Sequence, residues 1–458
     1  MTTPAAVPTL PRLDGAVLGA EAIVPFAGLL LSIAFMPLIA PKFWHHHYGK
    51  VTMGWALLAL APTVASQGWD VAFRELLHVT LLDYVPFIIL LATLYTITGG
   101  IRISGRLAGT PGANTATLGI GTVLAGFMGT TGASMLLVRP ILQANERRRH
   151  KAHVFIFLIF LVANIGGALS PLGDPPLFLG FLRGIDFFWP TMHLFLPTVL
   201  VAGLLLTCFY VLDTMLFRRE TVGRTERAIS GGEGRLTVRG EINFIFLGGV
   251  IASVMVSGRV DMLPAVEFAG LHVDLDGALR DVVLIGLCVA SLKLTEPGVR
   301  VGNGFKWMPM IEVAVIFAGI FATIVAPLAI LRSGTDGALS DVMALLNDGN
   351  QPVDHMFFWM TGLLSSFLDN APTYLAFFTA AGGDPHQLMG PLATTLAAIS
   401  AGAVYMGAMT YIGNAPNFMV KSIVESQGVR MPSFLGYMGW SIVFLVPVFL
   451  LVTLLFFA

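Results

Sequence analysis

Two aspartates lie in apolar stretches of the sequence, each beside residues that interrupt a helix. Asp174 belongs to a Gly-Asp-Pro-Pro run, and Asp369 begins an Asp-Asn-Ala-Pro run. A charged carboxylate at the membrane centre costs about 2.5–3.5 kcal/mol on insertion scales, so acids at such positions are candidates for function. Capping of the helix that follows is the structural alternative, because aspartate is a favoured N-cap residue.

Hydroxyl and amide side chains stand near these two acids. Their oxygens, together with the carboxylates, are the ligands that a hard cation such as Na⁺ prefers. We therefore predict that Asp174 and Asp369 bind sodium. The other predicted ion or substrate ligands are Thr130, Thr131, Ser134, Asn164, Ser170, Asn370, Thr373, Thr410, Asn414 and Asn417. For Asn370 and Asn414 helix capping explains the residue type equally well.

A third acid, Glu312, lies one turn into another apolar segment, after Pro309. Its place in a predicted span makes it a possible proton carrier. Pairing with Lys306 or Lys293 near one membrane face is the structural alternative, and the sequence leaves both open.

Helix starts near these breaks favour a different ligand. Short helices are predicted to begin at Ala133, Pro175, Ala371 and Ala415. The positive ends of their dipoles attract an anion. A carboxylate substrate held beside sodium is therefore an alternative to a bare cation.

The composition is typical of a membrane protein. Of the 458 residues, 55% are hydrophobic and only 12% are charged, whereas about a quarter of an ordinary soluble chain is charged. This balance cannot cover a soluble globular surface and excludes a soluble enzyme. The 50 glycines and 26 prolines favour broken, closely packed helices. No cofactor motif was identified.

The elements that must position these residues follow from the apolar segments, since a spanning helix needs about 20 apolar residues. Spans are predicted at Gly15–Ala40, Val51–Ser66, Tyr84–Ser104, Met192–Phe217, Ile242–Gly258, Asp281–Leu294, Met308–Leu331 and Ser433–Ala458. Segments 114–142 and 356–381 break in the middle, which predicts re-entrant hairpins. Segments 152–184 and 391–423 carry Gly-Asp-Pro-Pro and Gly-Asn-Ala-Pro, and are predicted to be broken helices that unwind at mid-depth.

Each half then has five spans and one hairpin, so the second half is inverted relative to the first. The predicted units are a first repeat at 1–217, a cytoplasmic linker at 218–240 and a second repeat at 241–458. On this topology most of the 26 Lys and Arg residues fall on one side, which the positive-inside rule assigns to the cytoplasm. Both termini are then predicted to lie outside.

An internal repeat supports the same division. A constant shift of 240 residues places Phe127–Gly132 on Phe367–Pro372 and Ser170–Phe178 on Thr410–Phe418. Between Ala163 and Phe178 the shift conserves Ala163, Gly167, Ala168, Gly173, Pro176 and Phe178. Paired broken segments in inverted halves indicate the substrate site of a transporter, because unwound backbone must face a cavity or an ion.

At these motifs the sequence resembles the ion transporter superfamily, which includes NhaD-type sodium/proton antiporters, arsenite permeases and citrate or dicarboxylate carriers. Asn164-Ile165-Gly166-Gly167 followed by Gly173-Asp174-Pro175-Pro176 is similar to the signature of the antiporter branch, and Asp369-Asn370 to its second hairpin motif. The resemblance implies an all-α elevator-type transporter that is a homodimer of a bacterial inner membrane. Thr130–Ser134 departs from the Ser-Asn-Thr type tip of the carriers.

The sequence therefore predicts a secondary transporter rather than an enzyme. The main reading is a sodium (or lithium)/proton antiporter in which Asp174 and Asp369 alternate between proton and metal, since a bound cation lowers an acid's proton affinity. The alternative is a sodium-coupled citrate or dicarboxylate transporter, or an arsenite-type permease. Expected partners are a small ion or anion and membrane lipid, with no nucleic acid. Gly-x-Gly-Asp of an intramembrane aspartyl protease is missing, because Pro171 replaces the first glycine.

Overall fold

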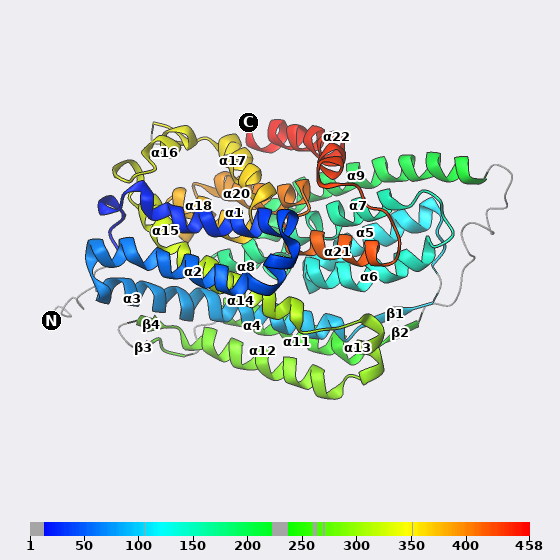
Figure 1. Cartoon of the computed structure of the whole chain (residues 1–458), viewed down its shortest axis with the longest axis horizontal. Helices are drawn as coiled ribbons and strands as arrows, with labels where there is room; N and C mark the ends of the chain where they lie inside the picture. The colour runs from blue at the N-terminus through cyan, green and yellow to red at the C-terminus, as the bar shows by residue number, and fades with distance from the viewer. Residues whose placement is uncertain (1–12, 106, 222–236, 260–262, 269–270, 350) are drawn as a thin grey trace.

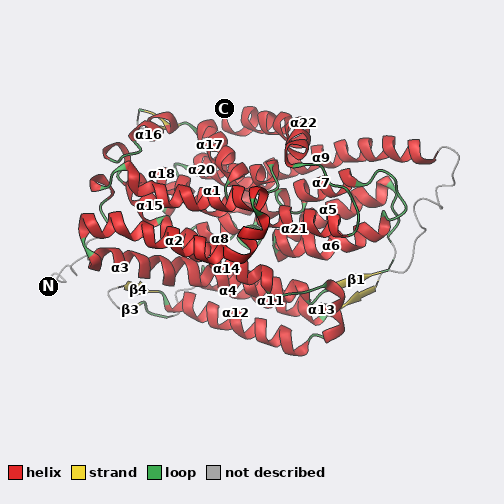
Figure 2. Ribbon diagram, viewed as in Figure 1, coloured by secondary structure: helices red, strands yellow, loops and turns green. Residues whose placement is uncertain are grey.

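The structure is a computed structural model that describes residues 13–105, 107–221, 237–259, 263–268, 271–349 and 351–458. These residues are mostly helical (Figure 2), and many of the helices run along the long axis of the molecule (Figure 1). The few strands in the described chain form three antiparallel pairs. They are β1 (Arg102–Ser104) with β2 (Thr237–Arg239), β3 (Val266–Phe268) with β4 (Leu271–Val273), and β5 (Asn347–Asp348) with β6 (Gln351–Pro352).

Several helices have the length and composition to cross a membrane. Among the described residues six pass this test, or seven if α12 (Leu275–Leu294) and α13 (Pro297–Asn303), bent by 98°, form one span. The six are Ala20–Pro37, Trp69–Gly99, Ala152–Leu169, Trp189–Glu220, Met308–Arg332 and Phe434–Phe457. The chain is thus an integral membrane protein, and the larger number of crossings expected from the sequence stays a prediction.

One group of helices combines the beginnings of both halves of the chain. In it α4 packs against α12, and α2 packs against α14. Its members from the first half are α1 (Val24–Ile39), α2 (Pro41–Gln67), α3 (Trp69–His78) and α4 (Val85–Gly99). From the second half come α11 (Ile242–Ser257), α12 (Leu275–Leu294), α13 (Pro297–Asn303), α14 (Met308–Thr323) and α15 (Val325–Arg332).

A second group contains the interrupted segments. Here α5 packs on α6, α17 on α20, α8 on α18 and α6 on α21. The first half contributes α5 (Pro111–Met128), α6 (Thr130–Ala144), α7 (Ala152–Leu161), α8 (Pro175–Leu182) and α9 (Trp189–Thr221). The second contributes α16 (Ser340–Leu346), α17 (Asp354–Phe367), α18 (Asn370–Ala380), α19 (Pro385–Met389), α20 (Ala393–Met406), α21 (Ala415–Ser426) and α22 (Phe434–Val452).

Several boundaries differ from the sequence prediction. The span predicted to begin at Val51 lies in a helix that begins at Pro41, and the helix start predicted at Ala133 lies at Thr130. The segment predicted to span from Tyr84 to Ser104 belongs to a helix that begins at Trp69, passes through a π-helical turn and ends at Gly99. The predicted linker at 218–240 is helical as far as Thr221 and contains β2, which pairs with β1. The rest of that linker, 222–236, lies outside the described residues.

Burial separates the core from the outer helices. The apolar segment Ala152–Leu169 is 89% buried by the rest of the protein, so it faces other helices instead of lipid. Outer helices instead expose large apolar side chains, including Met192 on α9, Ile245 on α11 and Val282 on α12. Such an apolar outer surface suits contact with lipid.

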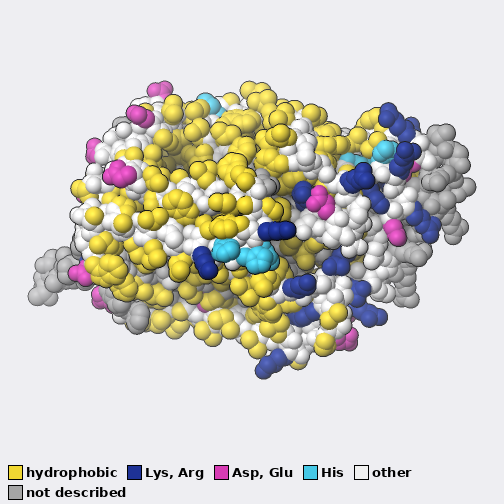
Figure 3. All heavy atoms as spheres, in the orientation of Figure 1, with side chains coloured by type: hydrophobic (Ala, Val, Ile, Leu, Met, Phe, Trp, Pro, Cys, Tyr) yellow, Lys and Arg dark blue, Asp and Glu magenta, His cyan; other side chains and the backbone are white. Residues whose placement is uncertain are grey.

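Charged side chains gather at the two ends of the long axis. In Figure 3 Lys and Arg side chains cluster toward the end formed by α13, β1, β2 and the C-terminal part of α9. Asp and Glu side chains are more prominent at the opposite end, around α3 and α16. We call the first of these the basic end.

Candidate functional site

The carboxylate of Asp174 joins four helix starts. Asp174 is 1% exposed and directly precedes α8. Its Oδ1 accepts hydrogen bonds from Thr130 Oγ1 at 3.0 Å and Asn414 Nδ2 at 3.2 Å. Its Oδ2 accepts one from Asn370 Nδ2. Thr130 and Asn370 begin α6 and α18, and Asn414 directly precedes α21.

This arrangement compensates a buried negative charge. A buried carboxylate is costly unless hydrogen bonds and opposite charge replace water. Three side-chain donors reach Asp174, and the amino ends of four helices supply positive dipoles. No Lys or Arg among the described residues is recorded in contact with it. The same surroundings would favour a bound anion or a cation shared with Asp174.

Close backbone packing shapes the break before α8. A side chain at Gly173 would place its Cβ 2.3 Å from the carbonyl oxygen of Gly167, so only glycine fits. The Gly173 carbonyl accepts from the backbone amide of Thr130 at 2.9 Å, and Gly129 beside it has φ +81°. Glycine adopts this conformation without strain. The sequence thus brings the tip between α5 and α6 onto the unwound segment.

A chain of amides crosses between the two breaks. Asn414 Nδ2 also reaches the Ala163 carbonyl at 3.1 Å and Asn164 Oδ1 at 3.3 Å. Asn164 Nδ2 donates to Asn417 Oδ1 at 2.8 Å. The Nδ2 of Asn417 in turn donates to the carbonyls of Gly407 and Thr410. These side-chain amides donate hydrogen bonds to backbone carbonyls near the unwound segments.

Ser170 and Thr410 make equivalent contacts. Ser170 Oγ donates to the Gly126 carbonyl and accepts from the Leu172 amide at 3.2 Å. Thr410 Oγ1 donates to the Ser366 carbonyl and accepts from the Ile412 amide at 3.2 Å. Every partner is shifted by the same 240 residues, the separation of Asp174 and Asn414. In this conformation each hydroxyl stabilises the backbone of one unwound segment.

Asp369 both caps a helix and lies near Asp174. Its Oδ1 accepts from the Ala371 amide at 3.1 Å, and its carbonyl accepts from Thr373 Oγ1 at 3.0 Å. The carboxylate is partly buried. It repels that of Asp174 electrostatically. Asp369 therefore caps α18 in this structure, as the structural alternative predicted. Asp369 and Asp174 nevertheless lie near enough to belong to one site.

Two buried polar atoms at this site have no hydrogen-bond partner among the described residues: Ser134 Oγ and Asn370 Oδ1. An unpaired buried acceptor costs about 1–3 kcal/mol, so such atoms are places where a ligand is expected. Asn370 Oδ1 belongs to the amide that donates to Asp174. No cluster of three or more His, Cys, Asp or Glu suited to a metal occurs in the described chain. A cation would thus need amide and hydroxyl ligands besides the acids.

Glu312 lies apart from this network. It is on α14, where its side chain interacts with Trp44 and His45 of α2. Its electrostatic neighbour is thus a histidine and not Lys306 or Lys293. The structure brings the other predicted residues together around the breaks, with Thr131 partly exposed at the start of α6.

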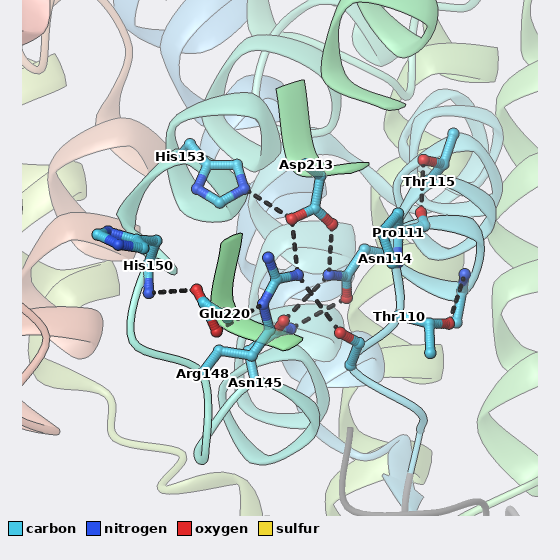
Figure 4. A network of polar contacts seen from close by, with 12 residues as sticks. Thr110, Pro111, Asn114, Thr115, Asn145, Arg148, His150, His153, Asp213 and Glu220 are labelled. Carbon is cyan, nitrogen blue, oxygen red and sulfur yellow. Dashed lines mark hydrogen bonds and ion pairs between the residues drawn. The ribbon is translucent and has the colours of Figure 1, made fainter. Parts of the chain in front are cut away.

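A polar cluster at the basic end was not predicted (Figure 4). Asp213 Oδ1 accepts from Arg148 Nη1 at 2.6 Å and from His153 Nε2 at 2.8 Å, and Oδ2 accepts from Asn114 Nδ2 at 3.0 Å. Asn114 and Asn145 exchange side-chain hydrogen bonds of 3.0 Å. The cluster links the N-terminal end of α5 and the C-terminal end of α6 to α9. The sequence signal that could have predicted this cluster is Asp213, an acid within the apolar sequence of α9.

A second unpredicted ion pair connects the two helix groups. Arg183, at the end of α8, donates Nη2 to Asp83 Oδ2 at 2.7 Å and Nε to Oδ1 at 3.1 Å. Asp83 lies in the π-helical turn before α4 and is 3% exposed. This two-pronged contact is the strong form of an Arg–carboxylate pair.

The sequence was also compared with known proteins. A family model described as "Putative citrate transport" matches residues 15–457, nearly the whole chain. No curated protein matches the sequence. The match covers all four interrupted segments and both aspartates of the site.

Proposed function

The chain belongs to this family of citrate-type transport proteins, and from that premise we propose that it is a secondary transporter of a small carboxylate anion such as citrate. The antiporter that the sequence favoured becomes the second candidate, because the family match supports the alternative better. The proposed activity moves its substrate without changing it chemically.

The observation that carries this proposal is the meeting of four helix starts at Asp174. Helix amino ends with their free amides are suited to binding carboxylates. The acids there also need a cation or proton, because a substrate anion beside two carboxylates would be repelled. We propose that sodium binds Asp174 and Asn370 Oδ1, or that a proton binds Asp174 alone, and that the anion binds next to it, near Thr131 and Ser134.

We further propose that the two halves are inverted repeats, each with a hairpin and a broken helix. Support comes from the hydrogen bonds of Ser170 and Thr410, whose partners are related by one shift. The glycine contacts agree: Gly413 approaches the Gly407 carbonyl as Gly173 approaches that of Gly167. In this proposal the helix group with the breaks moves against the other, within a dimer.

The same proposal sets the orientation in the membrane. The accumulation of Lys and Arg at one end (Figure 3) supports a cytoplasmic basic end. Both chain ends would then lie outside, and a bacterial inner membrane is the proposed location.

The proximity of Asp174 and Asp369 supports sodium/proton exchange as the second candidate function. Asp174 and Asp369 lie close enough for their charges to interact. Two neighbouring acids that exchange a proton for a cation would suffice for antiport without any anion.

Transport by the purified full-length protein in liposomes separates the two candidates. We expect labelled citrate to accumulate in the liposomes when a sodium or proton gradient is imposed. This accumulation should be lost in the Asp174→Asn variant. It should persist in the control variant Asp341→Asn, which changes an exposed acid outside the site. A pH dye inside the same vesicles tests antiport. Sodium-driven proton movement without citrate, combined with no citrate uptake, would replace the carrier proposal by the antiporter.

A further inference from the structure

A cavity of about 440 Å³ lies at the basic end, between α6, β1 and the ends of α13 and α21. Arg102 of β1 and Arg139 of α6 both line it, together with the polar side chains of Gln143, Asn303 and Gln427. No acidic residue is part of its lining among the described residues. The cavity is therefore positively charged.

Neither Arg102 nor Arg139 has an ion-pair partner among the described residues. Neither side chain makes a hydrogen bond or ion pair with the residues that the structure describes, and Arg139 Nε is buried without any acceptor. Arg148, Arg183 and Arg280, by contrast, each bind an aspartate at 2.6 to 2.8 Å. Both side chains are half-exposed, and Nε of Arg139 is their one atom found buried without a partner among the described residues; a buried N–H group without an acceptor is costly. An anion in the cavity would supply the missing acceptors.

Both guanidinium groups approach the same short turn at the end of α13. A Cβ added to Gly302 would lie 1.8 Å from Arg102 Nη1, and one added to Gly304 would lie 2.5 Å from Arg139 Nη2. Gly304 also has φ +63°, which favours glycine. Because the turn has glycines at these two positions, both guanidinium groups can lie against it. The paired N–H groups of each guanidinium can bind the two oxygens of one carboxylate.

The cavity is next to the helix that leads to Asp174. Arg139 lies on α6, whose first residue, Thr130, binds Asp174. Met135 and Leu136 line both this cavity and a smaller one that reaches Thr98. Thr98 in turn packs against Gly132 near the α6 start, where an added Cβ would lie 2.7 Å from its Cγ2.

We propose that Arg102 and Arg139 form a docking site for a di- or tricarboxylate at the basic end, on the route between that side and the Asp174 site. The inference rests on the proposed carrier function and names two further residues for it. Each arginine binds one carboxylate group of the same molecule. An anion with a single carboxylate therefore binds less tightly.

Citrate binding to the full-length protein in phosphatidylcholine nanodiscs, measured by calorimetry at constant ionic strength, tests the proposal. We expect Arg102→Gln and Arg139→Gln each to weaken binding about tenfold or more, as for a lost charge-assisted hydrogen bond. Arg147→Gln, an exposed arginine at the same end, should bind citrate like the unmodified protein. Arg139→Lys should fall between, because it keeps the charge and loses the fork.

A kinetic measurement adds a readout that a structural defect would not give. In oriented proteoliposomes, Arg139→Gln should raise KM for citrate entering from the basic end and leave KM from the opposite side unchanged. Equal citrate affinity in the arginine variants and the unmodified protein would overturn the docking site. It would also be overturned if the variants lost only bound phosphatidylglycerol, because the occupant would then be a lipid headgroup.

The two proposals fail in different ways. If the unmodified protein binds citrate through Arg139 but does not transport it, the docking site stands and the carrier function falls. If citrate transport depends on Asp174 and not on either arginine, the carrier function stands and the docking site falls. Absence of any citrate binding to the unmodified protein contradicts the docking site.

Discussion

Asn414 donates its side-chain amide to Asp174 Oδ1 over 3.2 Å, and the two residues are separated by 240 positions, the period of the internal repeat. Each directly precedes a short helix after an unwound segment. The repeat-related residues thus contact each other directly, one as acceptor and one as donor. The two positions thus share a place before a short helix, but one carries an acid and the other an amide.

This relationship predicts the outcome of a charge exchange. Asp174→Asn should lower citrate uptake at least about tenfold, the equivalent of one charge-assisted hydrogen bond. Asn414→Asp alone should also impair uptake, because it places two carboxylates side by side. The double variant restores one acid facing one amide and should recover part of the uptake in liposomes. Recovery no greater than in either single variant would argue against interchangeable roles.

The close approach of Gly173 to Gly167 predicts a packing defect. Gly173→Ala should destabilise the protein by about 1–3 kcal/mol, because the added methyl overlaps backbone. Unfolding in increasing dodecyl sulfate, followed by circular dichroism, measures this change. Gly203→Ala is the control, since nothing lies within 4 Å of that position on α9. If the two variants unfold alike, the tight contact is absent in the membrane protein.

The cluster around Asp213 predicts a difference between two acids. Asp213→Asn leaves the fully buried Arg148 without its partner and should cost about 3–5 kcal/mol of stability. Glu220 lies 3.8 Å from Arg148, so Glu220→Gln should cost less. The measurement is the monodisperse fraction that survives heating in size-exclusion chromatography. A larger loss for Glu220→Gln would mean that Asp213 is not the principal partner.

The ion pair between Asp83 and Arg183 predicts an effect on movement. It joins the two helix groups, so Arg183→Gln should weaken their contact in this conformation and shift the balance of conformations. The variant should therefore alter the citrate exchange rate, and Asp83→Asn should alter it in the same direction. A double-mutant cycle of exchange rates tests the coupling. Additive effects of the two changes would show that the pair does not act as a unit in transport.

The sequence predicted the local elements of the site well for a physical reason. Helix breaks depend on nearby Gly, Pro and Asn residues, and α5 and α6 meet at Gly129, inside the break predicted for segment 114–142. The re-entrant course of that segment stays a prediction. The helix starts predicted at Pro175 and Ala415 agree with α8 and α21. The 240-residue repeat relates Asp174 to Asn414, and the structure places these two side chains in contact.

Partners distant in the sequence could not be predicted in the same way. Arg148 belongs to a run of basic residues that indicates surface charge, but the fold buries it against Asp213 on α9. Arg183 likewise follows α8 without any local sign of Asp83, 100 residues earlier. Such contacts depend on which helices pack together. That Arg139 Nε is buried without a partner among the described residues likewise follows from how the helices pack.

The proposed site brings a carboxylate anion and a cation together at Asp174, beside the four helix starts. An experimental density map of the protein with citrate and sodium tests it most directly. We expect citrate density within hydrogen-bond reach of Thr131 and Ser134, and a cation bound by Asp174 and Asn370 Oδ1. Well-resolved helix starts with no citrate beside them, or citrate bound only away from Asp174, would contradict it.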